Sequence, residues 1–184
     1  MGRTVIALIF IFAILLPLCA ETGVIEFEYY FERVVANTIS DIYFTDINKN
    51  RISAYAINLS SDLSHPQVLA VVYTNKTSAN PYTITLSFTP LTLRNDPAPS
   101  FWGQYKAQVY RLINNEYTEI AGATVTVGNN PANSYSTSFT GDYSSSNDIT
   151  ISCYYPISFN FDPYLDTYTT GIYEGTIRIE AAAT

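Results

Sequence analysis

Apolar and polar side chains alternate along most of this sequence with a period of two. The clearest case is the segment 82–88, in which large apolar residues are separated by Thr and Ser. Because successive side chains of a strand point to opposite faces, this pattern predicts a strand that buries one face and exposes the other. The segment 68–73 is apolar on both faces, which is typical of a strand in the interior of a sheet. No long segment has apolar residues at helical spacing, so the sequence predicts an all-β chain.

A second alternation, from Ile149 to Phe161, is longer but contains Pro156. Because proline has no N–H to donate to a neighbouring strand, we expect either an edge strand or two strands joined by a bend at Tyr155 and Pro156. Cys153 lies on the apolar face of this segment, which predicts a buried small hydrophobe. Weaker alternations predict further strands in the segments 25–31, 40–44, 55–59, 105–113, 123–127, 135–139 and 172–179.

The predicted strands are short and are separated by clusters of Gly, Pro, Asn and Ser. This arrangement predicts an antiparallel, immunoglobulin-like β-sandwich of about eight to ten strands, with a closed barrel as the alternative. The chain has 184 residues, with no internal repeat and no long linker. We therefore expect a single domain over residues 21–184.

The first twenty residues have the pattern of a secretory signal peptide. Arg3 precedes an unbroken apolar run from Val5 to Leu16, and the small residue Ala20 ends the segment. As a helix, this run is too short to cross a hydrocarbon core of about 30 Å. We expect cleavage after Ala20 and export to the periplasm, the cell surface or the extracellular medium. The alternative is acylation of Cys19, which would tether the domain to a membrane.

The composition argues against most kinds of chemistry. The net charge is −7, so bulk charge will not hold the protein to nucleic acid or to an anionic membrane. His65 is the only histidine, and Ser60 and Asp62 lie beside it in one polar loop, whereas a catalytic triad needs groups that converge from separate elements. The acidic loops lack the spacing of an EF-hand. We therefore expect no enzyme activity, no catalytic residue, no cofactor and no metal site.

Aromatic residues are the remaining signal, with 16 Tyr and 10 Phe. Phe101, Trp102 and Tyr105 follow the Pro-rich segment 95–100. Exposed aromatic rings bury large areas at low entropic cost, so these three residues are a candidate ligand platform for a carbohydrate. The alternative is that the aromatic residues fill the core or lie on the outer faces of the sheets.

The segment that contains the last predicted strand runs from Thr170 to Glu180 and reads Thr-Gly-Ile-Tyr-Glu-Gly-Thr-Ile-Arg-Ile-Glu. It resembles the closing strand of bacterial fimbrial subunits and of spore coat protein U-like secreted domains, which follow a signal peptide and fold as immunoglobulin-like sandwiches. The resemblance implies a sandwich that lacks one strand and is completed by the N-terminal extension of a neighbour, through main-chain pairing and alternate side-chain pockets. A matching alternation follows the expected cleavage site, so the candidate partner strand consists of Val24, Ile25, Phe27, Tyr29 and Phe31. The alternative is that this segment pairs within its own sheet.

Together these features predict an exported bacterial surface or periplasmic protein with a structural or interaction role, such as a fimbrial-like or coat-like subunit. The alternative function is a carbohydrate-binding module. The expected partner is a protein, either another copy or a surface partner, with carbohydrate as the alternative and without nucleic acid. A membrane would be a partner only through acylated Cys19.

Overall fold

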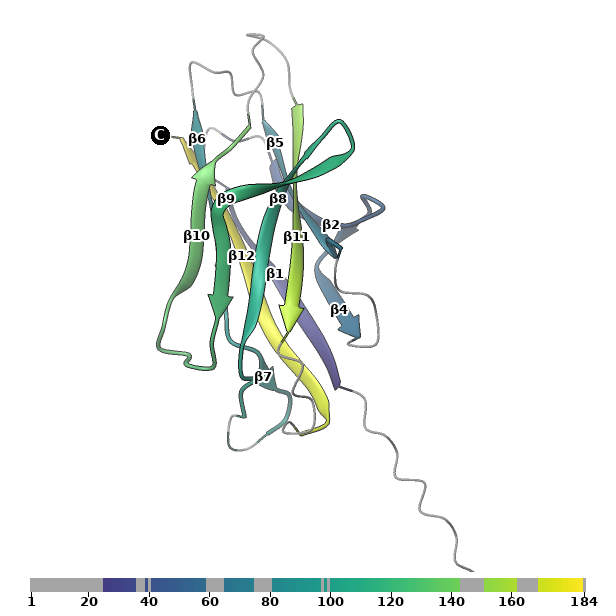
Figure 1. The fold of residues 1–184 in the computed structure, drawn as a ribbon, viewed down its shortest axis with the longest axis vertical. Coiled ribbons are helices and arrows are strands. Elements are labelled where there is room, and N and C mark those ends of the chain that lie inside the picture. The colour runs from purple at the N-terminus through teal and green to yellow at the C-terminus, as the bar shows by residue number, and fades with distance from the viewer. Residues whose placement is uncertain are drawn as a thin grey trace, which may run out of the picture.

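The computed structural model describes residues 25–35, 39, 41–58, 65–74, 81–96, 98, 100–142, 151–161 and 169–183. These residues form two six-stranded sheets and contain no helix (Figure 1). The predicted all-β sandwich is therefore confirmed. The expected signal peptide, with its cleavage site and Cys19, lies outside the described residues. Within the described ranges, no helix is long and apolar enough to span a membrane.

The first sheet, sheet A, has the strand order β10-β6-β12-β1-β4, and β7 also pairs with β12. All its pairings are antiparallel except that of β1 with β12, which is parallel. The bounds of its strands are Tyr135–Thr140 for β10, Tyr82–Phe88 for β6, Gly171–Ala183 for β12, Ile25–Val35 for β1, Ala54–Asn58 for β4 and Thr92–Leu93 for β7.

The second sheet, sheet B, has the order β3-β2-β5-β11-β8-β9 and is antiparallel throughout. The bounds of its strands are Arg51–Ile52 for β3, Asp41–Asp46 for β2, Val68–Thr74 for β5, Ile151–Phe161 for β11, Tyr105–Ile113 for β8 and Glu116–Val127 for β9. Two of the twelve strands, β3 and β7, have only two residues, which leaves ten longer strands.

The alternating segments put their apolar side chains between the sheets. In β6 the burial follows the predicted period of two, with Tyr82, Ile84, Leu86 and Phe88 buried. In β5 the residues Val68 to Val72 are buried on both faces, and β5 lies in the interior of sheet B between β2 and β11. Both segments therefore confirm what their patterns predict.

The prediction for the segment around Pro156 is wrong. This segment is the single strand β11, which lies in the interior of sheet B between β5 and β8. The pairing with β8 covers residues 157–161, whereas the pairing with β5 covers residues 151–157. Pro156 therefore lies just past the last residue that pairs with β8, where one side of the strand needs no N–H donor. A proline is tolerated in an interior strand at such a point.

The two lateral sides of the sandwich are connected in different ways. On one side the edge strands β9 and β10 meet, and Thr137 Oγ1 donates to the carbonyl oxygen of Gly122 at 3.3 Å. On the other side the chain passes from β3 in sheet B to β4 in sheet A through Ser53 alone. The second side is therefore a crossover, and β1 passes beside it, since Phe31 N donates to Ser53 O at 3.1 Å.

Candidate functional site

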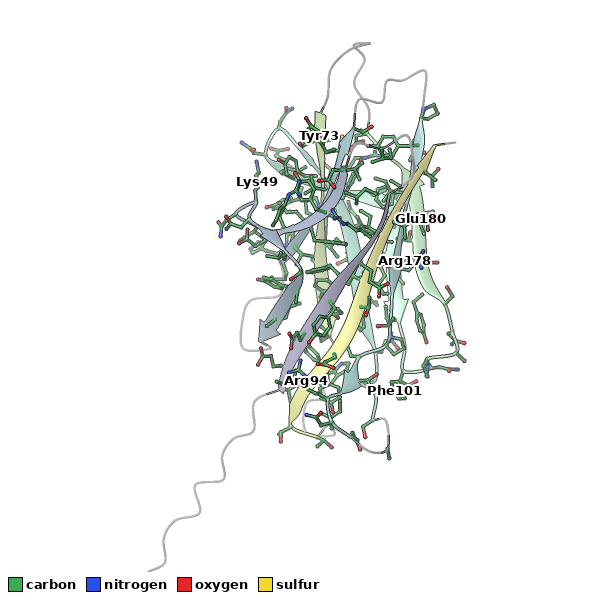
Figure 2. The ribbon with its side chains drawn as sticks, turned by 180° about the vertical axis from the view of Figure 1, so that it is seen from behind. Lys49, Tyr73, Arg94, Phe101, Arg178 and Glu180 are labelled. Atoms are coloured by element: carbon green, nitrogen blue, oxygen red, sulfur yellow. The ribbon has the colours of Figure 1, made fainter. Side chains whose placement is uncertain are left out.

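The predicted partner strand is β1, and in this chain it lies in the interior of sheet A between β12 and β4. All eleven residues of β1 are in register with β12, from Ile25 opposite Gly171 to Val35 opposite Ala181. The antiparallel pairing with β4 covers residues 26–30 of β1. Figure 2 shows β1 and β12 side by side along their length. The position beside β12 is thus filled by a strand of the same chain.

The inward face of β1 consists of aromatic side chains that insert into the core. Phe27 and Tyr29 are completely buried, and Ile25 and Phe31 are partly buried. Phe27 stacks on Phe161 with a centroid distance of 4.0 Å, and Tyr29 stacks on Phe159 at 4.9 Å. Phe27 and Tyr29 therefore pack across the core against the aromatic side chains of β11. Val24, the first residue of the predicted partner strand, lies outside the described residues.

On the outward face of β1, one arginine binds a carboxylate of β1 and a carboxylate of β12. Arg94 follows β7, and its guanidinium donates to Glu28 of β1 and to Glu174 of β12. Glu28 and Glu174 are opposite each other in the parallel register, so their two negative charges lie close together. The hydrogen bonds to Glu28 and Glu174 raise the pKa of Arg94 and keep its charge. Arg94 therefore links the two strands and compensates both carboxylates.

Sequence reasoning did not find the role of Arg94. The arginine is 66 residues from Glu28 and 80 residues from Glu174. Nothing in the local sequence around Arg94 points to either carboxylate, because the three residues come together only through the pairing of β7 and β1 with β12. The alternation in segment 25–31 predicts that Glu28 points outward, but it does not predict that Arg94 lies beside it.

The predicted ligand platform is not on the surface, so the expectation that Trp102 and Tyr105 form an exposed aromatic face is wrong. The exposed fractions are 1% for Trp102 and 2% for Tyr105, while Phe101 is half-buried. Trp102 N donates to Leu91 O at 2.8 Å, which folds the segment back on the sandwich. The indole then meets Phe27 edge-on, with a centroid distance of 4.8 Å. This aromatic ring contributes to the core beneath β1.

The residues considered for catalysis and metal binding are mostly outside the described ranges. His65 is exposed, and Ser60 and Asp62 are not described. In the part of the chain that the structure describes, no three His, Cys, Asp or Glu side chains are close enough together to hold a metal ion.

A buried polar cluster surrounds Cys153, where the chain leaves β10. Tyr82 Oη donates to the carbonyl oxygen of Asp142 at 2.5 Å, and the Cys153 thiol donates to the same oxygen at 3.4 Å. Asp142 N donates to Tyr155 Oη at 2.6 Å. Burial raises the pKa of the Cys153 thiol, which disfavours the nucleophilic thiolate. The predicted burial of Cys153 is confirmed, and its contacts hold residue 142 in place.

Comparison with known proteins adds no relative. A scan of protein-family models found no match to this chain, and a search of curated proteins also found none.

Proposed function

We propose that this protein is an exported bacterial structural or interaction protein of the cell surface or periplasm, and that copies of it join by exchanging β1. One observation carries the proposal. The first described strand of the chain lies in the interior of a sheet, pairs with neighbours on both sides and completely buries Phe27 and Tyr29. Such a strand completes the sheet whether it belongs to the same chain or to another copy.

The energetics favour a strand that can be supplied by either copy. Burying each large aromatic or aliphatic side chain contributes about 1.5–3 kcal/mol, and the main-chain pairing extends over all eleven residues of β1. A β1 from a second copy makes the same contacts as the chain's own β1, so exchange leaves the contact energy unchanged. Because β1 precedes every other described strand, it can leave sheet A without another strand being threaded.

The sequence resemblance supports the same element. The strand that resembles the closing strand of fimbrial and coat protein U-like domains is β12, and β12 is the strand that pairs with β1 along its full length. Addition of an extended segment to a strand in this way is an established mode of protein recognition. Trp102 does not support the carbohydrate-binding alternative, because its side chain is buried.

Mixed disulfide trapping tests strand exchange. Glu26 of β1 is opposite Asn58 of β4. Two chains of residues 21–184, which lack Cys19, are made in a Cys153→Ser background, one with Glu26→Cys and the other with Asn58→Cys, and they are refolded together and oxidised. We expect a covalent heterodimer on non-reducing gels, because β1 of one copy then lies against β4 of the other.

The control uses a pair of positions that stays within one chain. Lys106 of β8 is opposite Thr126 of β9, and both side chains are exposed. These strands are consecutive and joined by a tight turn, so a mixture of Lys106→Cys and Thr126→Cys chains should give no heterodimer. Strand exchange is disproved if the Glu26 and Asn58 mixture gives no more heterodimer than this control.

A further inference from the structure

A cavity of about 430 Å³ lies at the crossover side of the sandwich, where β1, β2 and β3 meet Ser53. Its apolar surface includes Phe31 and Phe44, whose rings stack with a centroid distance of 4.3 Å, and Ile52. Its polar wall includes Arg33 and Arg51. The complete lining is Phe31, Glu32, Arg33, Tyr43, Phe44, Arg51, Ile52 and Ser53. The volume is in the usual range for a pocket that binds a small molecule.

Both arginines of the cavity are held in fixed orientations. The Asp41 carboxylate lies between them and accepts from Arg33 Nη1 at 3.1 Å and from Arg51 Nη2 at 2.7 Å. Arg33 Nη1 also donates to Ile42 O at 3.2 Å. The Arg51 guanidinium lies over the Tyr43 ring, 3.7 Å from its centroid. Because these contacts orient the guanidinium groups beforehand, a ligand would lose less entropy in binding to them.

The arginines keep hydrogen-bonding capacity toward the solvent. Each guanidinium has about five N–H donors, and the bonds to Asp41 and Ile42 engage only Nη1 of Arg33 and Nη2 of Arg51. The side chains of Arg33 and Arg51 are 57% and 61% exposed. Glu32 also contributes to the lining, but strand alternation places it on the outward face of β1, with Glu28 and Tyr30. The cavity thus has two arginines, the Asp41 carboxylate between them and the Glu32 carboxylate in its lining.

We propose that this cavity binds an organic carboxylate with a flat or apolar body. The carboxylate accepts hydrogen bonds from the remaining N–H groups of Arg33 and Arg51, in the paired geometry that guanidinium groups favour. The body of the ligand lies against Phe31, Phe44 and Ile52. The Asp41 carboxylate is an example of this recognition within the protein, because it already accepts hydrogen bonds from the same two arginines. This site does not depend on strand exchange.

The test is a titration of the isotope-labelled protein, residues 21–184, followed by nuclear magnetic resonance. The probes are benzoate, acetate and inorganic phosphate, which separate a carboxylate with a body from a carboxylate without one and from an anion alone. For benzoate we expect saturable shifts at Arg51 and Ile52, with a Kd on the order of millimolar, since a ligand of so few atoms gains little affinity. Acetate and phosphate should bind at least about tenfold more weakly, because neither contacts the apolar surface.

Variants separate a binding site from a purely structural ion pair. Arg51→Met should weaken benzoate binding about tenfold or more, because a charge-assisted hydrogen bond is lost. Lys106→Met is the control, since Lys106 is an exposed cation on β8, a strand that does not line the cavity. This control should leave the affinity unchanged. Arg33→Met should repeat the loss seen with Arg51→Met.

Three results would overturn the proposal. One is the absence of saturable benzoate shifts at the cavity residues. Another is phosphate binding as tightly as benzoate, which would make the cavity a general anion site. The third is an equal effect of Arg51→Met and Lys106→Met on affinity in folded proteins, which would leave Arg51 with a structural role alone.

Discussion

At the scale of single residues, Gly141 leaves room for one of the largest buried side chains. A Cβ added at Gly141 would overlap the ring of Tyr82. Tyr82 cannot move away easily, because its ring is completely buried and its hydroxyl donates to Asp142 O at 2.5 Å. The glycine is therefore required by close packing, and its backbone does not have a positive φ.

The first prediction concerns Gly141→Ala. Because the methyl group must displace the Tyr82 ring, we expect the free energy of unfolding to fall by about 3 kcal/mol, the upper end for overpacking a core. The comparison is Gly122→Ala, where nothing lies within 4 Å of the added Cβ and only the φ of +76° opposes the change; that strain costs about 1–2 kcal/mol. Urea unfolding of both variants measures the difference, and a smaller loss for Gly141→Ala than for Gly122→Ala would contradict the packing argument.

The second prediction concerns the pH dependence that Asp142 introduces. Burial raises the pKa of Asp142, although the ion pair with Arg111, at 2.9 Å, opposes the shift. A raised pKa means that the folded protein binds a proton more tightly than the unfolded chain does, so the contribution of Asp142 to stability grows as the pH falls through its raised pKa. Compared with Asp142→Asn, the native protein should gain relative stability between neutral pH and about pH 4. Paired unfolding curves over this range measure the effect, and a difference that stays constant would rule it out.

At the scale of elements, a strand could be predicted where the residues that determine its position lie within its own segment. The strand β6 could be predicted with its bounds, because the alternation from Tyr82 to Phe88 is fully contained in the segment. The interior position of β11 could not, because Pro156 is tolerated only by virtue of where β8 stops pairing. The sequence left open whether Trp102 is exposed or buried for the same reason, since its partners Phe27 and Tyr173 lie in the first and last described strands.

The candidate sites likewise combine features that the local sequence predicts with features that it does not. The alternation in segment 25–31 identified the strand and its inward aromatic residues, whereas the parallel pairing with β12 has no local signal. The cavity at Arg33 and Arg51 was not predicted at all, because these residues come from different sheets and meet only through Asp41.

The third prediction concerns the link between β1 and β12 through Arg94. Replacing Arg94 with Met leaves Glu28 and Glu174 opposite each other without a counter-charge, so β1 should open more often. We expect amide hydrogen exchange in β1 to accelerate on the order of tenfold, with little change in β5 of sheet B. The double variant Arg94→Met with Glu174→Gln removes the like-charge pair and should recover part of the protection. Equal acceleration in both sheets would mean that Arg94 acts on the whole fold.

At the scale of the whole molecule, the parallel register places the start of β1 and the end of β12 at opposite ends of the sandwich. Ile25 lies opposite Gly171, and Val35 lies opposite Ala181. All residues of β1 are paired with β12, so the whole length of this pairing lies between the two ends.

The fourth prediction follows from that arrangement. When tension is applied through Glu26 and Ala182, β1 and β12 are pulled along their length in opposite directions, and the hydrogen bonds between them share the load. When it is applied through Glu26 and Ile172, which are opposite each other, the bonds break one after another. Single-molecule pulling should therefore give a clearly higher rupture force for the first attachment than for the second, and equal forces would contradict the argument. A filament of such domains joined end to end would resist stretching in shear.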